Sequence, residues 1–319
     1  MVLGLTVDGA DLLAQEQPSL ASETVTSAGV GRSAPTYLVL GVPFRTGSLS
    51  PGNENDAQAY RDASLIGHLS AAGCKVTDGG NLAIPSYLPH HSVPPIRSWP
   101  GPRIVWDIVG EKVSETLRRP GQIPLLIGCD CSIVVGTANA LRGSFQEVHV
   151  IYIDGDFDDA APASAHCQSA ASCATWFLTH ESAFSLSPAL KPSQVSQVGW
   201  TRGAQTEQAG MRSFSLADVR RIGPRQVAQQ VLAAVPASAA ILLHLDIDVF
   251  RSSDLPAAYF PHPEGISLKE GTELLGVFLR DARVRVIEVS EYATLRDREQ
   301  ESVQKIIEMF VQTLPKSAG

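Results

Sequence analysis

The segment VHVIYIDGDFDD, residues 148–159, decides the fold, because an apolar, β-branched run ends in a cluster of acids. Its first six residues have the length and composition of a strand that is buried on both faces. Asp154, Asp156 and Asp158 follow at intervals of two, so in an extended segment their side chains point the same way. Carboxylates this close repel one another and lose hydration, which is costly unless a cation lies among them. The segment therefore predicts a metal site at the end of a buried strand.

A second acidic strand end follows in AILLHLDIDVF, residues 240–250, where Asp246 and Asp248 share a face. If the two strands are neighbours in one parallel sheet, their five carboxylates converge. Ligand sites in open α/β sheets lie outside the carboxyl ends of the strands, which is where both groups stand. Any single Asp in such a place also fits a helix cap or a turn, but caps rarely occur in sets with this spacing.

Strand and helix patterns alternate through the rest of the chain, which favours a parallel sheet with helices on both faces. We therefore predict a single-domain, three-layer α/β/α fold with a mostly parallel sheet over residues 36–315. Residues 1–35 are rich in Ser, Ala, Thr and Gly without periodicity, and we expect an N-terminal extension that is ordered only in part. Within the domain, the pattern predicts one helix over 57–72 that ends at Gly73.

Composition narrows the classes of function. Hydrophobic residues make up 44% of the 319 residues, which supports a substantial core. The net charge of −8 argues against a nucleic-acid partner. No stretch approaches the roughly 20 apolar residues of a membrane span, and the N-terminal residues lack the basic start of a secretory signal. Five cysteines, an odd number, fit a reducing, cytoplasmic setting.

Five motifs between residues 37 and 312 resemble the arginase/agmatinase family of ureohydrolases, which share their fold with histone deacetylases. They are GVPF at 41–44, GCDCS at 128–132, IDGDFD at 153–158, LDIDVF at 245–250 and VIEVSEYATLRD at 286–297. The family's corresponding patterns are a Gly-rich loop, Gly-Gly-Asp-His-Ser, Asp-Ala-His-x-Asp, Asp-x-Asp and a late Glu. The resemblance implies the arginase/deacetylase-like fold.

The resemblance also implies a metal-ligand set. The family's carboxylate ligands fall on the four residues Asp154, Asp158, Asp246 and Asp248, whereas its two histidine ligands fall on Cys131 and Asp156. We therefore take these six residues as the expected metal ligands, for one or two divalent ions. Mn²⁺ is the first expectation, with Mg²⁺, Zn²⁺ or Fe²⁺ as alternatives, because carboxylates suit Mn²⁺ and Mg²⁺ while a thiolate favours Zn²⁺ or Fe²⁺.

Three residues are expected to act in catalysis. Glu291 matches the glutamate that receives the substrate's guanidinium, and Asp158 holds a metal beside the reacting carbon. The family's proton-shuttling His should lie near Gln168, where this chain has none, so we take His166 as its substitute. Glu291 equally fits an acid paired with an Arg at the edge of the core.

The two histidine replacements leave a surplus of negative charge at the site. Five carboxylates and a thiol face the space that four carboxylates and two imidazoles occupy in the family pattern. The surplus must be relieved by raised pKa values at Asp156 or Cys131, by the Arg202 guanidinium or a cationic substrate, or by extra water around a harder cation.

Cys131 has three interpretations: a metal ligand, a small buried residue, or a nucleophile. Nucleophilic action requires a base within reach, and His166 and His244 are the candidates. We favour His244 as a buried core histidine with satisfied hydrogen bonds.

The leading hypothesis is a metal-dependent hydrolase of a non-peptide C–N bond in a guanidine, amidine or amide. In it, cations held at Asp154 and Asp246 activate water for attack on the carbon. The alternatives are the same fold with a different, non-hydrolytic reaction on a small molecule, such as a phosphorylated ligand with Mg²⁺, or a catalytically inactive homologue. The resemblance implies a small-molecule substrate and a homo-oligomer, a trimer or hexamer.

Overall fold

The computed structural model describes residues 34–52, 54–163, 165–184, 189–202 and 210–317. The expected N-terminal extension, residues 1–35, therefore lies outside the described residues except for its last two positions. No helix within the described ranges is long and apolar enough to cross a membrane.

Eight strands form one sheet in the order β2-β1-β3-β8-β7-β4-β5-β6, and every neighbouring pair is parallel. The strands are β1 Thr36–Gly41, β2 Lys75–Asn81, β3 Gln122–Ile127, β4 Val148–Ile153, β5 Val195–Val198, β6 Arg212–Phe214, β7 Ala240–Asp246 and β8 Val284–Ser290. The predicted mostly parallel sheet is thus confirmed.

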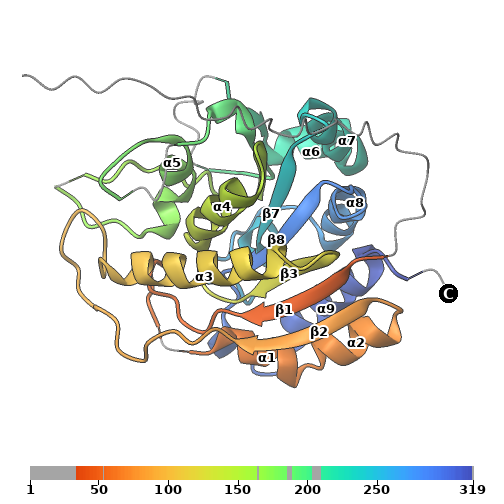
Figure 1. Ribbon diagram of the computed structural model, residues 1–319, viewed down its shortest axis with the longest axis horizontal. Helices are drawn as coiled ribbons and strands as arrows, with labels where there is room; N and C mark the ends of the chain where they lie inside the picture. The colour runs from red at the N-terminus through yellow and green to blue at the C-terminus, as the bar shows by residue number, and fades with distance from the viewer. Residues whose placement is uncertain (1–33, 53, 164, 185–188, 203–209, 318–319) are drawn as a thin grey trace, which may run out of the picture. The chain divides into compact units, whose positions relative to one another are not determined.

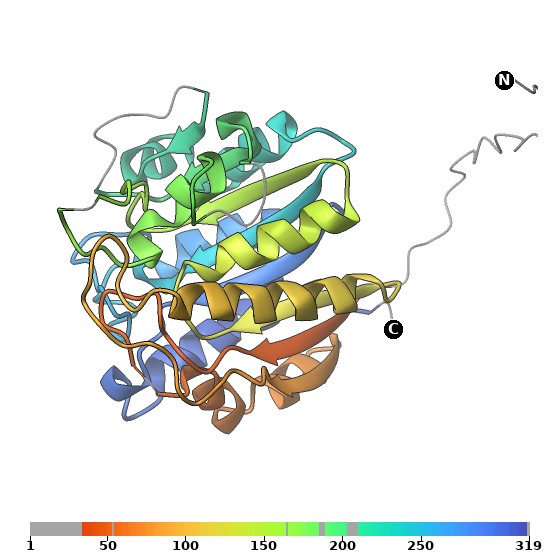
Figure 2. The same ribbon diagram turned by 60° about the vertical axis from the view of Figure 1, so that its left-hand side comes forward.

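Nine α-helices of the described chain cover the two faces of this sheet. They are α1 Asp56–Asp62, α2 Leu65–Ala71, α3 Gly101–Leu117, α4 Ile133–Ser144, α5 Ala174–Thr179, α6 Leu216–Ile222, α7 Pro224–Ala234, α8 Leu268–Phe278 and α9 Glu301–Thr313. Helices α3, α4 and α5 pack on one face, and the other six pack on the opposite face, so two apolar layers enclose the sheet. Figures 1 and 2 show α3 and α4 side by side along one side of the sheet. The three-layer α/β/α prediction is confirmed.

The predicted single helix over 57–72 is wrong in one respect, because it is two helices, α1 and α2. Ser64 between them has φ 60°, a left-handed conformation that interrupts the helical hydrogen bonds. The apolar periodicity continues across the break, since Ala59 and Leu69 both lie in the same core. The apolar periodicity indicates which face of a helix is buried, but it does not predict this local turn.

Sequence analysis also missed β6 and α6. Strand β6 has three residues and lies at the sheet edge, which is too short for a periodic signal. Helix α6 does carry a signal, a capping box in which Ser215 and Asp218 bond each other's backbone amides.

The sheet order brings the site together. Strands β3, β8, β7 and β4 are consecutive neighbours, so their carboxyl ends meet at one edge. All six residues of β4 and all seven of β7 are buried, as their apolar runs predict. The two acidic segments therefore begin where two fully buried central strands end.

Candidate metal centre

The two acidic strand ends converge around Cys131. The Cys131 Sγ, which follows β3, is 2.7 Å from Asp246 Oδ2 at the end of β7 and 3.9 Å from Asp154 Oδ2 after β4. Asp154, Asp246 and Asp248 each offer a carboxylate oxygen within 4.8 Å of the others. Asp154 and Asp246 thus share one pocket. We call the three aspartates, Asp154, Asp246 and Asp248, the acidic centre.

These aspartates act both as turn residues and as members of the acidic cluster. Asp154 Oδ1 accepts a 2.6 Å bond from the Asp156 N–H, and Asp246 Oδ1 accepts a 2.7 Å bond from the Asp248 N–H. Asp248 Oδ1 in turn accepts from the Gly155 N–H at 3.1 Å, which links the two strand ends. The turns use one oxygen of each strand-end aspartate, and the second oxygen, Oδ2, faces Cys131.

No Lys, Arg or His of the described residues forms an ion pair with Asp154 or Asp246 of the acidic centre. Burial, followed by repulsion from neighbouring carboxylates, raises the pKa of Asp154 and Asp246 well above the ordinary value of 3.8. Burial likewise raises the pKa of the Cys131 thiol well above its ordinary value, and Asp246 and Asp154 add to the effect. A divalent cation removes all three penalties at once, so the donor set fits such an ion.

Asp158 lies beside this centre. Its Oδ2 accepts a 2.7 Å hydrogen bond from the Tyr152 hydroxyl, and its backbone has φ 50°. Burial raises the pKa of its carboxyl group, although the bond from Tyr152 opposes the rise. Cys129 and Glu291 also have positive φ, at 70° and 61°. Left-handed conformations at non-glycine residues cost energy and cluster at functional sites, as they do here at the ends of β3, β4 and β8.

A cavity of about 290 Å³ opens onto the centre. Its walls combine acids, small polar groups and an apolar rim: Ser48, Leu49, Cys131, Asp154, Asp156, Asp158, Cys167, Gln168, Ser169, Ala171, Ser172, Asp246, Asp248, Phe260 and Glu291. The Glu291 side chain is buried, and its Oε2 has no hydrogen-bond partner. Among the described residues no Arg forms an ion pair with Glu291, so the core-edge alternative is without its expected partner. Burial, then Asp130, raise the pKa of this carboxyl group, which favours a cationic ligand beside it.

One side of the centre is a buried hydrogen-bond chain, which we call the inner flank. Cys131 Sγ is 3.1 Å from Ser290 Oγ, which is 3.2 Å from His244 Nε2. His244 Nδ1 is 2.8 Å from Glu288 Oε2, and the ring stacks on Tyr152. His244 is therefore a buried histidine with both nitrogens hydrogen-bonded, and Ser290 separates it from the Cys131 thiol.

The opposite side, which we call the outer flank, holds Asp156, Arg202 and His262. Arg202 Nε is 3.5 Å from Asp156 Oδ1, so this guanidinium, one of the groups that could relieve the surplus charge, is next to the extra carboxylate. His262 Nε2 lies 3.5 Å from Asp156 Oδ2 and 3.4 Å from Asp248 Oδ2. Burial lowers the pKa of His262, but the neighbouring Asp156 and Asp248 carboxylates outweigh this effect and raise the pKa to about 9. The Arg202 guanidinium also contacts His262 Nδ1.

The loop after β1 closes over the centre. Asp130 is fully buried and accepts a 2.9 Å bond from the Gly47 N–H and a 3.1 Å bond from the Ser132 N–H. This contact fixes the loop, whose residues Ser48 and Leu49 line the cavity. A long Gly/Ser/Pro-rich loop early in the chain thus has a defined place at the site.

His166, the expected substitute for a proton shuttle, is exposed. The next residues in the chain, Cys167 and Gln168, line the cavity, whereas His166 is not among the described lining residues. Its backbone N–H donates to Ala163 O at 3.1 Å.

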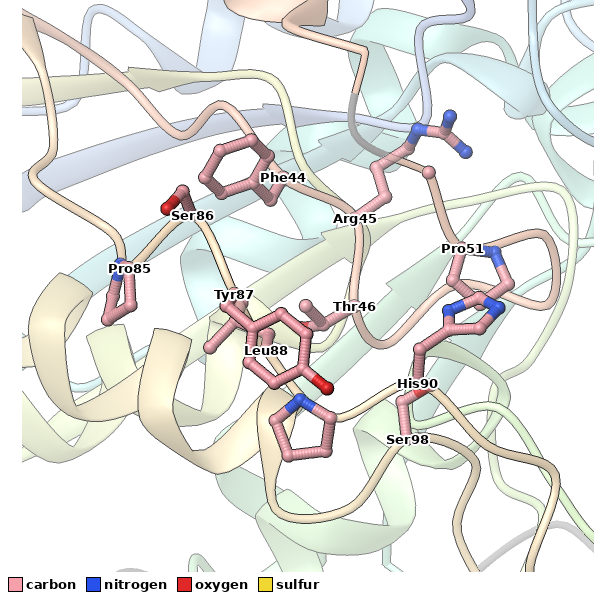
Figure 3. Close-up of a pocket in the computed structure, with 12 residues that line it drawn as sticks. Phe44, Arg45, Thr46, Pro51, Pro85, Ser86, Tyr87, Leu88, His90 and Ser98 are labelled. Atoms are coloured by element: carbon pink, nitrogen blue, oxygen red, sulfur yellow. The ribbon is translucent and has the colours of Figure 1, made fainter.

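A second cavity, of about 240 Å³, lies between the loop after β1 and residues 85–98. Figure 3 shows that the Arg45 guanidinium points away from the ring of Tyr87. That guanidinium bonds Asp56 and Glu54 and stacks on Tyr259 at 3.4 Å. No carboxylate or thiol is among the described residues that line the second cavity, whereas the first cavity has both.

Sequence reasoning missed His262, Ser290 and Tyr152 as parts of the site. Ser290 and Tyr152 lie on strands next to motif residues, where alternation with known site residues could have indicated them. His262 lies in a Pro-rich loop 14 residues after Asp248, and no local pattern connects it with the acidic strand ends.

The fold and this site define an open parallel α/β protein with an acidic candidate metal centre at the carboxyl ends of four central strands. The family model described as "Arginase family" matches residues 35–314. The chain belongs to the arginase family.

Relatives and solved structures agree with this membership. Arginase-2, mitochondrial, of Rattus norvegicus is 26% identical over 262 residues, covering 75% of this chain and 72% of the relative. The crystal structure of arginase from Bacillus cereus is similar with a TM-score of 0.76 and 21% identity, covering 89% of this chain and all of that one. The crystal structure of Trypanosoma cruzi formiminoglutamase with two Mn²⁺ has a TM-score of 0.70 and 20% identity, covering 89% of this chain and 94% of that one. These two structural likenesses show the fold.

Proposed function

We propose that this protein is a metal-dependent hydrolase of a non-peptide C–N bond in a small guanidine, amidine or amide. The observation that carries the proposal is the convergence of two acidic strand ends with the unpaired Glu291 carboxyl group in one cavity. Family membership supports the reaction class, and the formiminoglutamase crystallised with two Mn²⁺ supports divalent cations at such a site.

The expected ligands are Asp154, Asp158, Asp246 and Asp248, with Cys131 and Asp156 as the two atypical members. All six line the cavity. A bound divalent ion supplies Lewis-acid chemistry there: it lowers the pKa of water and offsets developing negative charge. Mn²⁺ matches the excess of carboxylate donors. One or two ions fit the donor groups.

This chain's own residues bind and orient the substrate. Glu291 Oε2 is free to accept hydrogen bonds from a cationic guanidinium or amidinium. The Tyr152 hydroxyl holds the Asp158 carboxyl group at a fixed place in the cavity wall. His166, next in the chain to lining residues, is the proposed proton carrier between the cavity and solvent.

The rim of the cavity constrains the far end of the substrate. Leu49 and Phe260 line it and are 43% and 39% exposed. No Lys or Arg is among the described lining residues, so the cavity offers no ion-pair partner for a substrate carboxylate. We therefore propose a guanidine or amidine with an uncharged, partly apolar tail in preference to an α-amino acid.

The test is to incubate Mn²⁺-loaded protein with a panel of guanidino, amidino and formimino compounds and to measure urea and ammonia. We expect release that depends on metal and is absent in the Asp154→Asn/Asp246→Asn variant, with charged-tail compounds turned over more slowly than uncharged ones. No release above background from any member of the panel would contradict the proposal.

A second candidate is the same fold used for a non-hydrolytic reaction, and one observation favours it: no histidine is among the described lining residues of the cavity. Full activity that survives exhaustive chelation would support this candidate over metal-dependent hydrolysis.

A further inference from the structure

The outer flank presents an imidazole to two carboxylates in an arrangement that hydrogen bonding does not explain well. His262 is 2% exposed, and its backbone oxygen accepts a 2.7 Å bond from the Ser252 N–H, so its place is fixed. Its Nε2 stands 3.4 Å from Asp248 Oδ2 and 3.5 Å from Asp156 Oδ2. Charge-assisted N–H···O bonds are shorter, about 2.7–2.9 Å.

These separations match the edge of a coordination polyhedron. Two donor atoms that are each about 2.1–2.2 Å from one cation, at angles of about 90–110°, lie about 3.0–3.6 Å apart. The ligand atoms of Asp156, Asp248 and His262 all lie within 4.8 Å of one another. The Glu291 carboxyl group, which is buried with an unpartnered oxygen, lines the same cavity as the two aspartates.

Gly155 makes this approach possible. A Cβ at this position would stand 2.6 Å from His262 Cδ2, so a larger residue would displace the imidazole. In this chain the acidic segment IDGDFD has glycine at this position, directly before Asp156. The absence of a side chain at Gly155 thus leaves room for His262 beside Asp156.

We propose that His262 ligates a divalent cation together with Asp156 and Asp248, and so supplies from a loop the imidazole that the β4 strand end lacks. This inference rests on the proposed metal-dependent function and specifies one of its ion sites. Two carboxylates and one imidazole suit Mn²⁺, Fe²⁺ or Zn²⁺.

Arg202 controls access to this site. Its guanidinium contacts His262 Nδ1 and places a positive charge beside the proposed ion site. This charge repels a divalent cation at His262 Nε2, so Arg202 must move aside when the ion binds. Its side chain is 59% exposed, which gives it room to do so. Arg202 and the cation therefore compete. We expect His262→Ala to weaken metal binding and Arg202→Gln to strengthen it.

The experiment titrates metal-stripped, full-length protein with MnCl₂ by calorimetry and counts retained ions by elemental analysis. We expect His262→Ala to weaken the binding of one ion at least about 10-fold, and Arg202→Gln to tighten it. Asp156→His in the His262→Ala background should restore binding, because it returns an imidazole to the strand end. His166→Ala is the matched control and should leave binding unchanged. Pulsed EPR of bound Mn²⁺ should show nitrogen coupling in wild type that is reduced in His262→Ala.

The outcomes separate this inference from the proposed function. If His262→Ala binds Mn²⁺ as well as or better than wild type, the imidazole is a competing cation and the inference is overturned, while the proposed function stands. If Arg202→Gln, an exposed position with little effect on folding, weakens binding, the inference is also overturned. Wild type that retains no ion overturns both.

Discussion

The inner and outer flanks of the acidic centre each place an imidazole near an expected metal ligand, but the two imidazoles have different hydrogen-bond partners. On each side an expected metal ligand lines the cavity, Cys131 inside and Asp156 outside. On each side an imidazole from a different segment stands nearby, His244 inside and His262 outside. Both nitrogens of His244 bond protein groups, whereas His262 Nε2 faces two carboxylates at 3.4 and 3.5 Å.

This difference indicates that the hydrogen bonds of each imidazole, and not only its proximity to the acidic centre, decide whether it is available to a cation. The Glu288 carboxyl group orients His244, and Ser290 lies between it and the thiol, so the inner imidazole supports the strands β7 and β8. The outer imidazole instead contacts three charged side chains, those of Asp156, Asp248 and Arg202, which a bound cation would rearrange.

The largest expected effect is on the free energy of unfolding, and it distinguishes the two flanks. His244→Phe leaves the buried Glu288 carboxyl group with neither oxygen paired and should lower the free energy of unfolding by about 3–5 kcal/mol. His262→Ala in metal-free protein should cost less, about 1–3 kcal/mol, because Asp156 keeps its contact with the Arg202 guanidinium when the imidazole is lost. Denaturant unfolding measures both.

The control for that comparison is Glu288→Gln in the His244→Phe background, which should recover part of the loss by removing the unpaired acid. Equal losses for His244→Phe and His262→Ala would show that the two imidazoles have the same structural role.

The next effect concerns charge. In metal-free protein at neutral pH, Asp154→Asn/Asp246→Asn should raise the melting temperature by about 2–8 °C, because burial and repulsion penalise these carboxylates. Their folded pKa values are raised, so the folded state binds more protons than the unfolded state above pH 4. Wild-type stability should therefore fall as the pH rises from about 4 through the raised folded pKa values.

Calorimetric melting of both proteins between pH 4 and 8 checks this sign. The variant should show a flatter profile in that range, and addition of Mn²⁺ should stabilise only the wild type. A variant that melts below wild type across the whole range would mean that the centre is not short of positive charge.

Replacement of Glu291 tests substrate binding separately from metal binding. Glu291→Gln should reduce kcat/KM for a guanidino substrate by about 100-fold, since it replaces the charged partner of a cation, and should leave Mn²⁺ content unchanged. Glu270→Gln is the matched control, because Glu270 caps α8 and lies outside the cavity lining. A parallel loss of metal in Glu291→Gln would make Glu291 part of the ion site.

The smallest expected effect distinguishes the two cysteines of GCDCS. Cys131→Ser should lower Zn²⁺ affinity about 10-fold relative to Mn²⁺, because a thiolate prefers Zn²⁺. Cys129→Ser should not, because Cys129 Sγ donates to Phe44 O at 3.0 Å and faces the loop. Identical metal preferences in both variants would assign Cys131 a packing role.

The sequence was sufficient for the sheet and for the convergence of Asp154 with Asp246, because buried parallel strands leave a strong apolar signal and bring their ends to one edge. It was not sufficient for the break at Ser64, which is a single left-handed residue inside a continuous apolar pattern. His262 was also beyond reach, because its role depends on a long-range approach past Gly155. Arg202 was one of several groups considered as a source of relief for the surplus charge, and it lies next to Asp156.

The most direct test of the central claim is the number of divalent ions retained by protein purified without added metal and then loaded with Mn²⁺. If the β4 and β7 strand ends form one cation-binding pocket, wild type retains one or two ions per chain and Asp154→Asn/Asp246→Asn retains none. Wild type that retains no ion, or a double variant that retains as many as wild type, would contradict the account.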